Sequence, residues 1–334
     1  MSKIKNKKYS FSIIIPCRNE KYYISQCVNS ILAQNYNKNL IEIIIVDGLS
    51  DDGTKEIVEN LIAKNSNIKL YNNPDKKTPK ALNIGVKKSK NDIIIILGAH
   101  TELDSNFVSL NNKFHSEKNI KVTGGTQLNV GKTFKQKLIA TVMEIPFGMA
   151  SAKYRWSNKE QFVDTVVYAA YRRELFDELG NFEEKFAISE DAEFNWRVRK
   201  AGYKIFYSPK IKSKYYPRKS IGAFLKQLYR YGILRVNVIK KHFDSIKFYH
   251  LIPPIFVLSL LFLLVFSIFY NISFFVLLFL LTIYFLTSFF TSLPKLKGKK
   301  KSFFILVPLL IFFMHISWGT GFLVGAILPK SEKY

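Results

Sequence analysis

The sequence lacks the features of a secreted or dinucleotide-binding protein. It has only two cysteines, Cys17 and Cys27, which form no CxxC pair and no disulfide framework, so a reducing cytosol is expected. Its basic start, MSKIKNKKYS, contains no apolar core before the first apolar strand, so no secretory signal is predicted. The soluble part contains neither GxGxxG nor GxxxxGK[ST], which argues against a dinucleotide or Walker-type phosphate site.

Acidic residues are also scarce. Lys and Arg together number 50 against 25 Asp and Glu, a formal net charge of +25 over 334 residues. This balance favours anionic partners such as nucleic acid, an acidic membrane surface or a phosphorylated substrate. No recognised nucleic-acid-binding motif occurs, and the chain becomes almost wholly apolar after residue 248, so we predict no nucleic-acid partner.

The apolar part contains three long runs, which are 251–269, 272–290 and 303–328. The first two carry no charge and have about 19 residues each, enough to cross a hydrocarbon core of roughly 30 Å as helices. The third has His315 as its only ionisable group and is interrupted by Gly319, Gly321 and Gly325, so part of it is expected either to span or to lie in the interface.

Two basic segments flank the first pair of runs. They are 240–247 before it and Lys295–Lys301 after it, and the positive-inside rule places both in the cytoplasm. The sequence therefore predicts a multi-pass protein of the cytoplasmic (inner) membrane, whose soluble domain faces the cytoplasm.

The soluble part alternates apolar runs with amphipathic segments. The runs 11–16, 41–46, 68–71 and 93–97 read as buried strands, and helices are expected at 24–32, 54–63 and 79–88. Unbroken apolar strands alternating with helices are typical of a parallel sheet covered on both faces. Ligands of such sheets bind at the carboxyl ends of the strands.

Polar segments follow each of these strands. They are PCRNE (16–20), DGLSDDGT (47–54), the Lys- and Asn-rich loop 72–77, and GAH (98–100). An Asp at a strand end can accept from a base N–H or a ribose hydroxyl, whereas Ser and Asp in a turn can also serve only as caps. Because four such segments converge on one edge, we predict a ligand site there.

The following stretches resemble the family-2 inverting glycosyltransferases, most of all the succinoglycan-biosynthesis type: SIIIPCRNE (12–20), LIEIIIVDGLSDDGT (40–54), ALNIG (81–85), VDTVVYAAYRRELFDELGNF (163–182), SEDAEFNWRVRKAGYKIFYSP (189–209) and QLYRYG (227–232). The resemblance covers roughly residues 10–250 and also fits the apolar tail. It implies a nucleotide-sugar-binding, GT-A-like α/β fold, with a mostly parallel sheet and helices on both faces, followed by an all-α transmembrane region. The implied division is a basic tail (1–9), a nucleotide-binding half (10–105), an acceptor-binding half with interfacial helices (106–248) and a membrane domain (249–330).

The resemblance implies a set of residues around the nucleotide-sugar donor. Asp47 would sit by the base or ribose, although many relatives have two consecutive Asp where this chain has Asp47 and Gly48. Asp52 would hold the turn or contact the nucleoside. The implied donor-binding residues are Pro16, Arg18, Glu20, Asp47, Asp52, Asn83, Gly98 and Ala99.

The segment Gly98-Ala99-His100 departs from the family pattern. In the branch that this chain resembles, Asp-Ala-His would hold a divalent cation, Mg²⁺ or Mn²⁺, that neutralises the donor diphosphate. Here the Asp is absent and His100 remains. A single imidazole suits Mn²⁺ better than Mg²⁺. We therefore expect the donor phosphates to hold most of the ion, with Arg230 and lysines sharing the phosphate charge.

The carboxylates Glu190 and Asp191 match the catalytic element of the family. The resemblance makes Asp191 the general base that takes the proton of the acceptor hydroxyl, with Glu190 positioning the acceptor or tuning its neighbour. Taken alone, the pair also reads as the acidic first turn of a helix capped by Ser189, and the two interpretations are compatible.

Gln227, Arg230 and Tyr231 match the QxxR[W/Y] element of the family. Arg230 would pair with the diphosphate, and Gln227 and Tyr231 would face acceptor or donor. The alternative is an interfacial helix with a snorkelling arginine. For segment 134–156, an amphipathic element at the membrane surface and a core helix both remain open.

The sequence thus predicts a membrane-bound glycosyltransferase. It would transfer a sugar from a nucleotide-sugar, a UDP-sugar, to a lipid-linked or growing glycan in cell-surface polysaccharide synthesis. Other polysaccharide-assembly proteins are expected as further partners. One alternative is a processive synthase, although three candidate crossings are few for a translocation channel. The other is a catalytically weakened, membrane-anchored binding or scaffold subunit, which the departure at Gly98 suggests.

Overall fold

The computed structural model describes residues 7–117, 120–150, 152–186 and 189–328. Residues 1–6 of the predicted basic tail and 329–330 of the predicted membrane domain lie outside this range. The chain forms two compact units. The first is Met1–Leu128 with Ser157–Tyr215, and the second is Asn129–Trp156 with Tyr216–Tyr334. The predicted limit between cytoplasmic and membrane parts at residue 248 stays a prediction, because these units follow packing within the chain.

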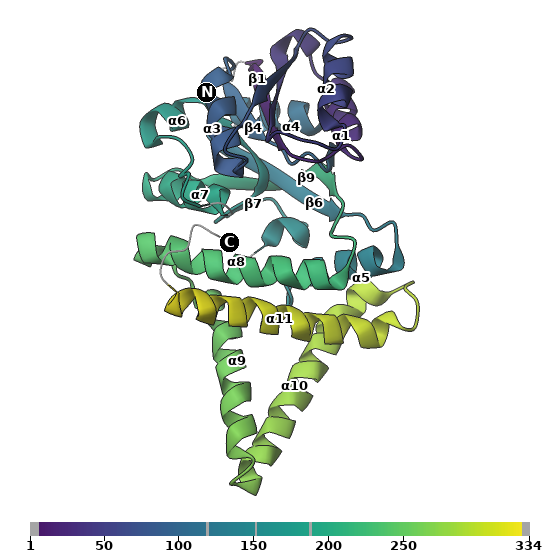
Figure 1. Cartoon of the computed structure of the whole chain (residues 1–334), viewed down its shortest axis with the longest axis vertical. Helices are drawn as coiled ribbons and strands as arrows, with labels where there is room; N and C mark the ends of the chain where they lie inside the picture. The colour runs from purple at the N-terminus through teal and green to yellow at the C-terminus, as the bar shows by residue number, and fades with distance from the viewer. Residues whose placement is uncertain (1–6, 118–119, 151, 187–188, 329–334) are drawn as a thin grey trace. The chain divides into compact units, whose positions relative to one another are not determined.

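The first unit is built on a mixed sheet in the order β3-β2-β1-β4-β8-β6-β9-β5, with β7 paired to β9 (Figure 1). The strands of its parallel part are β1 (Phe11–Cys17), β2 (Ile41–Asp47), β3 (Ile68–Asn72) and β4 (Ile93–Ile96). They confirm the four predicted strands. The remaining strands are β5 (Thr101–Leu103), β6 (Val122–Asn129), β7 (Gln161–Val163), β8 (Val167–Arg172) and β9 (Ile205–Tyr215). Here β4–β8, β6–β8, β5–β9 and β7–β9 are antiparallel, so the sheet is parallel only in its N-terminal half.

Helices cover both faces of this sheet because its strands are apolar on both faces. The helices of the first unit are α1 (Ile24–Leu32), α2 (Thr54–Ile62), α3 (Thr78–Lys88), α4 (Phe107–Glu117), α6 (Glu174–Leu179) and α7 (Glu190–Lys200), with the short turn η1 (Lys38–Leu40). Ile13 and Ile15 of β1 share a core with Val28 of α1 and Val58 of α2. Ile14, on the opposite face, lies against α3. The helices predicted at 24–32, 54–63 and 79–88 are therefore confirmed.

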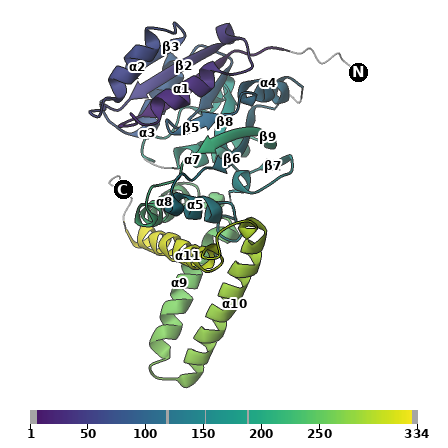
Figure 2. The ribbon, with the colours of Figure 1, turned by 90° about the vertical axis from the view of Figure 1, so that its right-hand side faces the viewer.

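The second unit is helical (Figure 2). Its helices are α5 (Phe134–Met143), α8 (Ile221–Lys241), α9 (Phe248–Phe266), α10 (Asn271–Leu296) and α11 (Phe303–Ile327), with the turns η2 (Lys153–Arg155) and η3 (Phe243–Ser245). The three predicted apolar runs form α9, α10 and α11, which by length and composition could each cross a membrane. In α11 the glycines do not interrupt the helix. α5 buries Leu138 through Met143, as the core-helix alternative for segment 134–156 expects.

Candidate active site at the carboxyl edge of the sheet

The carboxyl ends of the parallel strands meet at one edge of the first unit. Asp47, the last residue of β2, lies in register with Cys17 of β1 on one side and with Asn72 of β3 on the other. Leu97, just after β4, donates its backbone N–H to the carbonyl of Ile14 in β1 at 2.9 Å. The segments after β1, β2 and β4 therefore leave the sheet side by side, as the strand order requires.

The two loops after β1 and β2 are joined by reciprocal hydrogen bonds. The side-chain amide of Asn19 donates to Oδ1 of Asp51 at 2.9 Å, and the backbone N–H of Asp51 donates to Oδ1 of Asn19 at 3.1 Å. Asn19 adopts a left-handed backbone conformation with φ of 58°, which Asn tolerates better than most residues. No motif in the sequence marks Asn19 as a site residue, and its position after a strand is the only feature that points to it.

Asp47 is 2% exposed and held by its own loop. The backbone N–H of Ser50 donates to its Oδ2 at 2.9 Å, and the Ser50 hydroxyl donates to Oδ1. The Cys17 thiol donates to the same Oδ1 at 3.6 Å. Burial, and then the charge of Asp47, raise the pKa of Cys17 far above its ordinary value, so this thiol stays protonated. The Asp47 carboxylate is fixed in place before any ligand arrives.

Asp52 holds the turn into α2, the first of its two predicted roles. Its Oδ1 accepts from the backbone N–H of Thr54 at 3.0 Å and from the Thr54 hydroxyl, and its Oδ2 accepts from the N–H of Lys21 at 3.2 Å. Burial opposes ionisation of this carboxyl, but the hydrogen bonds from Thr54 and Lys21 outweigh it and lower the pKa of Asp52.

The Arg18 side chain is exposed and packs beside Gly48. A β-carbon at position 48 would stand 3.3 Å from Cβ and 3.4 Å from Cδ of Arg18, which is tighter than most such contacts. The glycine that replaces a second aspartate therefore makes room for a cationic side chain at the edge. Pro16, the remaining predicted donor contact of β1, is half-buried within the strand.

His100 is paired with Glu20. Nδ1 of His100 lies 3.1 Å from Oε1 of Glu20, and both side chains are partly exposed. The His100 ring also lies between Tyr23 and Tyr215, with ring centroids 6.3 and 5.4 Å away. Because Nδ1 is engaged by the carboxylate, the ring orientation is set and Nε2 is the nitrogen left for a ligand.

The neighbours of His100 offer little else to a cation. Ala99 is buried in the apolar core, and Glu102 accepts from Gln26 and lies 3.6 Å from Nζ of Lys214. Among the residues that the structure describes, no group of three or more His, Cys, Asp or Glu could hold a metal ion. Nε2 of His100 is thus a single nitrogen donor, of a kind that Mn²⁺ tolerates better than Mg²⁺.

Glu190 and Asp191 open α7, as predicted. Ser189 precedes them in a left-handed conformation with φ of 78° and makes no side-chain capping bond, unlike the cap expected from the sequence. Burial, followed by the neighbouring charge of Asp191, raises the pKa of the half-buried Glu190 to about 8. Asp191 is exposed, and its Oδ1 accepts from the N–H of Ala192 at 2.7 Å. At neutral pH this raised pKa favours a protonated Glu190.

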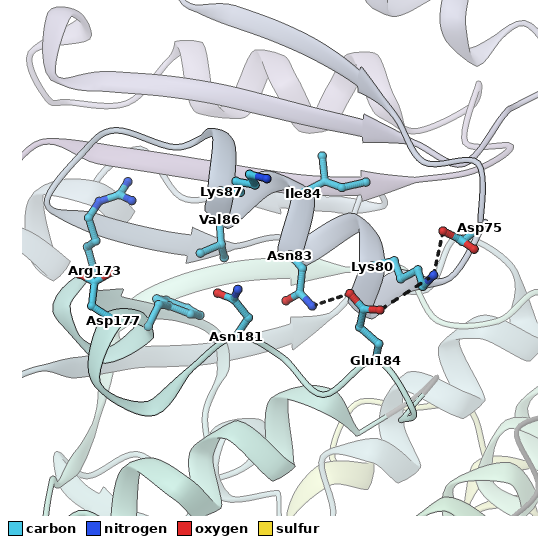
Figure 3. A pocket seen from close by; sticks show the side chains of 11 residues that line it. Asp75, Lys80, Asn83, Ile84, Val86, Lys87, Arg173, Asp177, Asn181 and Glu184 are labelled. Carbon is cyan, nitrogen blue, oxygen red and sulfur yellow. Dashed lines mark hydrogen bonds and ion pairs between the residues drawn. The ribbon is translucent and has the colours of Figure 1, made fainter.

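The segment leading to this pair is held by Asn83. Its Oδ1 accepts from the backbone N–H of Phe182 at 3.0 Å, and its Nδ2 donates to the carbonyl of Phe182 at 2.9 Å and to Glu184 at 3.1 Å. Figure 3 shows Asn83 facing Glu184, which in turn faces Lys80. Asn83 was predicted to line the nucleotide pocket, yet its amide is engaged by this backbone.

Arg197 of α7 holds the same segment from the other end. Its guanidinium donates to the carbonyls of Leu179, Gly180 and Asn181 and forms a bidentate pair with the fully buried Glu193. No motif in the sequence marks Arg197. An open cavity of about 660 Å³ lies beside the segment, lined by Asp75, Lys80, Asn83, Ile84, Val86, Lys87, Arg173, Phe176, Asp177, Asn181 and Glu184.

Gln227, Arg230 and Tyr231 lie on α8 of the second unit. The Gln227 amide donates to the Tyr231 hydroxyl at 2.7 Å, and Arg230 is exposed. These positions are one helical turn apart, so Gln227 and Tyr231 share a face. Their predicted contacts with donor or acceptor stay predictions.

Known proteins resemble this chain over most of its length. The family model described as glycosyl transferase family 2 matches residues 12–180. A dolichyl N-acetyl-α-D-glucosaminyl phosphate 3-β-D-2,3-diacetamido-2,3-dideoxy-β-D-glucuronosyltransferase of Methanococcus voltae is 30% identical over 96% of this chain and 98% of its own. The succinoglycan biosynthesis protein ExoA of Rhizobium meliloti is 27% identical over 69% of this chain and 70% of its own.

A solved structure shares the fold. A mannosyltransferase from Pyrobaculum calidifontis, determined with GDP-Man and Mn²⁺, superposes with a TM-score of 0.55 at 18% identity. The match covers 72% of this chain and 66% of that one. The predicted GT-A-like fold is therefore confirmed.

Proposed function

The chain belongs to glycosyl transferase family 2, and we propose that it transfers a sugar with inversion from a nucleotide-sugar to a lipid-linked glycan. It is a glycosyltransferase with a helical C-terminal part suited to a membrane. The observation that carries the proposal is the full-length likeness to the Methanococcus voltae transferase, which includes the region of the apolar helices.

The edge formed by Asp47, Arg18 and Glu20 is proposed to bind the donor. The Asp47 side chain, fixed by its loop, would accept from the uracil N–H or a ribose hydroxyl of a UDP-sugar. The exposed guanidinium of Arg18 would meet the diphosphate, because its fork of N–H donors matches phosphate oxygens. Gly98 leaves space beside the edge, since a β-carbon there would lie 3.5 Å from its nearest neighbour, Oγ1 of Thr101.

Asp191 is proposed to act as the general base. It would take the proton of the acceptor hydroxyl while that oxygen forms a bond to the anomeric carbon and the bond from this carbon to the nucleoside diphosphate breaks. An ionised carboxylate is needed for this role. The raised pKa of Glu190 favours its protonated form, which would donate a hydrogen bond to the acceptor.

A divalent cation is proposed as a weak partner of the donor. Nε2 of His100 would contact it while Glu20 orients the ring, and Mn²⁺ tolerates this nitrogen better than Mg²⁺ does. The ion would neutralise charge on the departing diphosphate. Arg18 would share that task, which is why we expect residual turnover in excess chelator.

The acceptor is proposed to be a sugar phosphate on a polyprenol. The Methanococcus voltae relative acts on dolichyl N-acetylglucosaminyl phosphate, which is a substrate of this class. The apolar helices would hold the enzyme where such a substrate resides, which we take to be the cytoplasmic side of the cell's inner membrane. Other glycan-assembly proteins would then supply the acceptor and consume the product.

The experiment is a transfer assay with detergent-purified full-length chain, labelled nucleotide-sugars and a polyprenyl-phosphate N-acetylglucosamine acceptor. We expect one UDP-sugar to give a product extended by a single residue. Asp191→Asn should reduce turnover by roughly a hundred- to ten-thousand-fold while UDP binding is unchanged. Asp177→Asn, which removes an exposed acid of α6, serves as the matched control.

Two outcomes would contradict the proposal. Binding of UDP-sugar without turnover by the unaltered chain would favour the scaffold alternative. Products with a long ladder of lengths would instead favour a processive synthase.

A further inference from the structure

Helix α11 is joined to α8 along its C-terminal half. A β-carbon on Gly321 would lie 2.0 Å from the carbonyl oxygen of Tyr229, and one on Gly232 would lie 2.2 Å from that of Trp318. One on Gly325 would lie 2.8 Å from Cα of Ile233. The two backbones therefore touch, and no other residue fits at these glycines. The glycines that seemed to interrupt the third apolar run are what brings it against α8.

The ends of the two helices are also tied together. Nζ of Lys240, next to the last residue of α8, donates to the carbonyls of Gly325 and Leu328 at 2.9 Å each. An ammonium group at these carbonyls satisfies acceptors that the last turn of α11 leaves open. Because Tyr229, Ile233 and Lys240 meet successively later parts of α11, the helices run in the same direction.

α8 is too charged to lie in hydrocarbon. Lys226, Arg230 and Arg235 are distributed along the helix at intervals of four and five residues. α8 is also absent from the helices whose composition suits a membrane span, among the residues that the structure describes. Charged side chains are costly at the bilayer centre, whereas a helix with both basic and apolar residues suits the interface.

The hairpin α9–α10 has a different direction. Figures 1 and 2 both show α8 and α11 running across the base of this hairpin rather than along it. Most of its large side chains are exposed, and its helices carry no charge between residues 251 and 290. If the hairpin stands along the membrane normal, α8 and α11 lie in the membrane plane.

From these contacts we propose that only α9 and α10 cross the bilayer, and that α11 lies with α8 in the interface. The C-terminal end of α11 then lies on the same side of the membrane as the basic segment Lys295–Lys301. Basic residues flank both ends of α11 in the sequence, with Lys295–Lys301 before it and Lys330 and Lys333 after it, which is consistent with this arrangement.

The outer face of α11 fits lipid as its partner. Ile305, Leu309 and Phe313 recur every four residues, so they share one face, and they are 74%, 40% and 45% exposed. An apolar stripe of this kind, beside a basic helix, can rest in the acyl boundary of an anionic membrane. A helix crossing the core would instead meet hydrocarbon over its full length.

The test is cysteine labelling of the full chain in sealed vesicles of known orientation. One cysteine at a time is introduced at Ser331, which follows α11 in the sequence, at Lys299, or at Asn271, the first residue of α10. The unaltered chain gives the background, because Cys17 and Cys27 are buried. We expect a membrane-impermeant maleimide to label Ser331→Cys from the same side as Lys299→Cys and from the side opposite to Asn271→Cys.

Labelling of Ser331→Cys from the Asn271→Cys side would overturn the proposal. So would labelling only after detergent is added. A second comparison measures insertion depth by placing one lysine in each helix. Phe313→Lys in α11 should leave the membrane-inserted amount within about two-fold, because an interfacial lysine reaches the headgroups. Ile283→Lys, near the middle of α10, should lower it about ten-fold or more. Equal losses would place α11 in the core.

Discussion

The donor edge, formed by Asp47, Arg18 and Glu20, and the base segment, by which we mean residues 179–184 with Glu190 and Asp191, are held in opposite ways. At the donor edge, Asp47 and Asp52 accept hydrogen bonds from their own loops, so the carboxylates proposed to face the donor also hold these loops in place. At the base segment, Asp191 is exposed, and the bonds that fix its approach are made by Asn83 and Arg197 to residues 179–184.

This difference teaches how each region tolerates change. A carboxylate that both binds and holds a loop cannot be altered without moving the loop. An exposed base can be altered without disturbing the bonds that hold its segment, and the residues that hold the segment can be altered without removing the base. Mutations at the donor edge should therefore change donor binding and stability together. Mutations at the base segment should change turnover and leave donor binding unaltered.

Among the changes that test this comparison, the largest effect on donor binding is expected from Asp47→Asn. The amide would lose charge towards the donor and disturb the bonds from Ser50, and a hydrogen bond to a charged group contributes about 1.5–3 kcal/mol. We expect UDP affinity to fall about ten- to a hundred-fold and the melting temperature to fall with it. Calorimetry and thermal unfolding measure both, with Glu59→Gln on the surface of α2 as control. Unchanged affinity would remove Asp47 from the donor site.

The next effect concerns Asn83. Asn83→Ala frees the Phe182 backbone, so we expect kcat to fall about ten-fold through misplacement of Asp191, while UDP affinity stays within two-fold. Asn83→Asp should recover part of kcat, because its oxygen can still accept from the Phe182 N–H. A fall in UDP affinity with unchanged kcat would instead support the pocket-lining role that the sequence suggested.

The sequence predicted the first half of the fold well because its elements are local. Apolar runs such as 41–46, amphipathic helices such as 24–32 and the turn signals between them need no knowledge of distant residues. The antiparallel strands were not assigned because they are short or pair with partners far along the chain. β7 has three residues and pairs with β9, more than 40 positions later.

The sequence predicted which residues belong to the candidate site better than it predicted what each of them does. Asp47, Glu190 and Asp191 could be named from their motifs, but Asn83 and Arg197 act through backbone groups that no motif records. The pairing of Glu20 with His100 was also missed. These residues lie 80 positions apart and meet only because β1 and β4 are adjacent in the sheet.

A smaller effect is expected from Gly98→Asp at the donor edge. The position needs no left-handed backbone, and a β-carbon there would meet Thr101 and Tyr168 at ordinary distances of 3.5 and 3.7 Å. A carboxylate beside His100 should raise Mn²⁺ affinity in the presence of UDP about ten-fold. Electron paramagnetic resonance of free Mn²⁺ measures this directly. Gly98→Ala is the control for bulk, and no gain over it would show that His100 does not face the ion.

The smallest effect tests the base segment through pH. Glu190 has a folded-state pKa of about 8 against an ordinary value of 4.5, because burial and the charge of Asp191 disfavour its ionised form. Between these values the folded chain keeps a proton that the unfolded chain has released. Stability from this group is therefore fully present below pH 4.5 and is lost as pH rises towards 8. Glu190→Gln carries no titrating proton, so its thermal unfolding should depend less on pH across this window, whereas Asp177→Asn should keep the parent slope. An unchanged slope in Glu190→Gln would mean that Glu190 does not hold a proton at neutral pH in the folded chain.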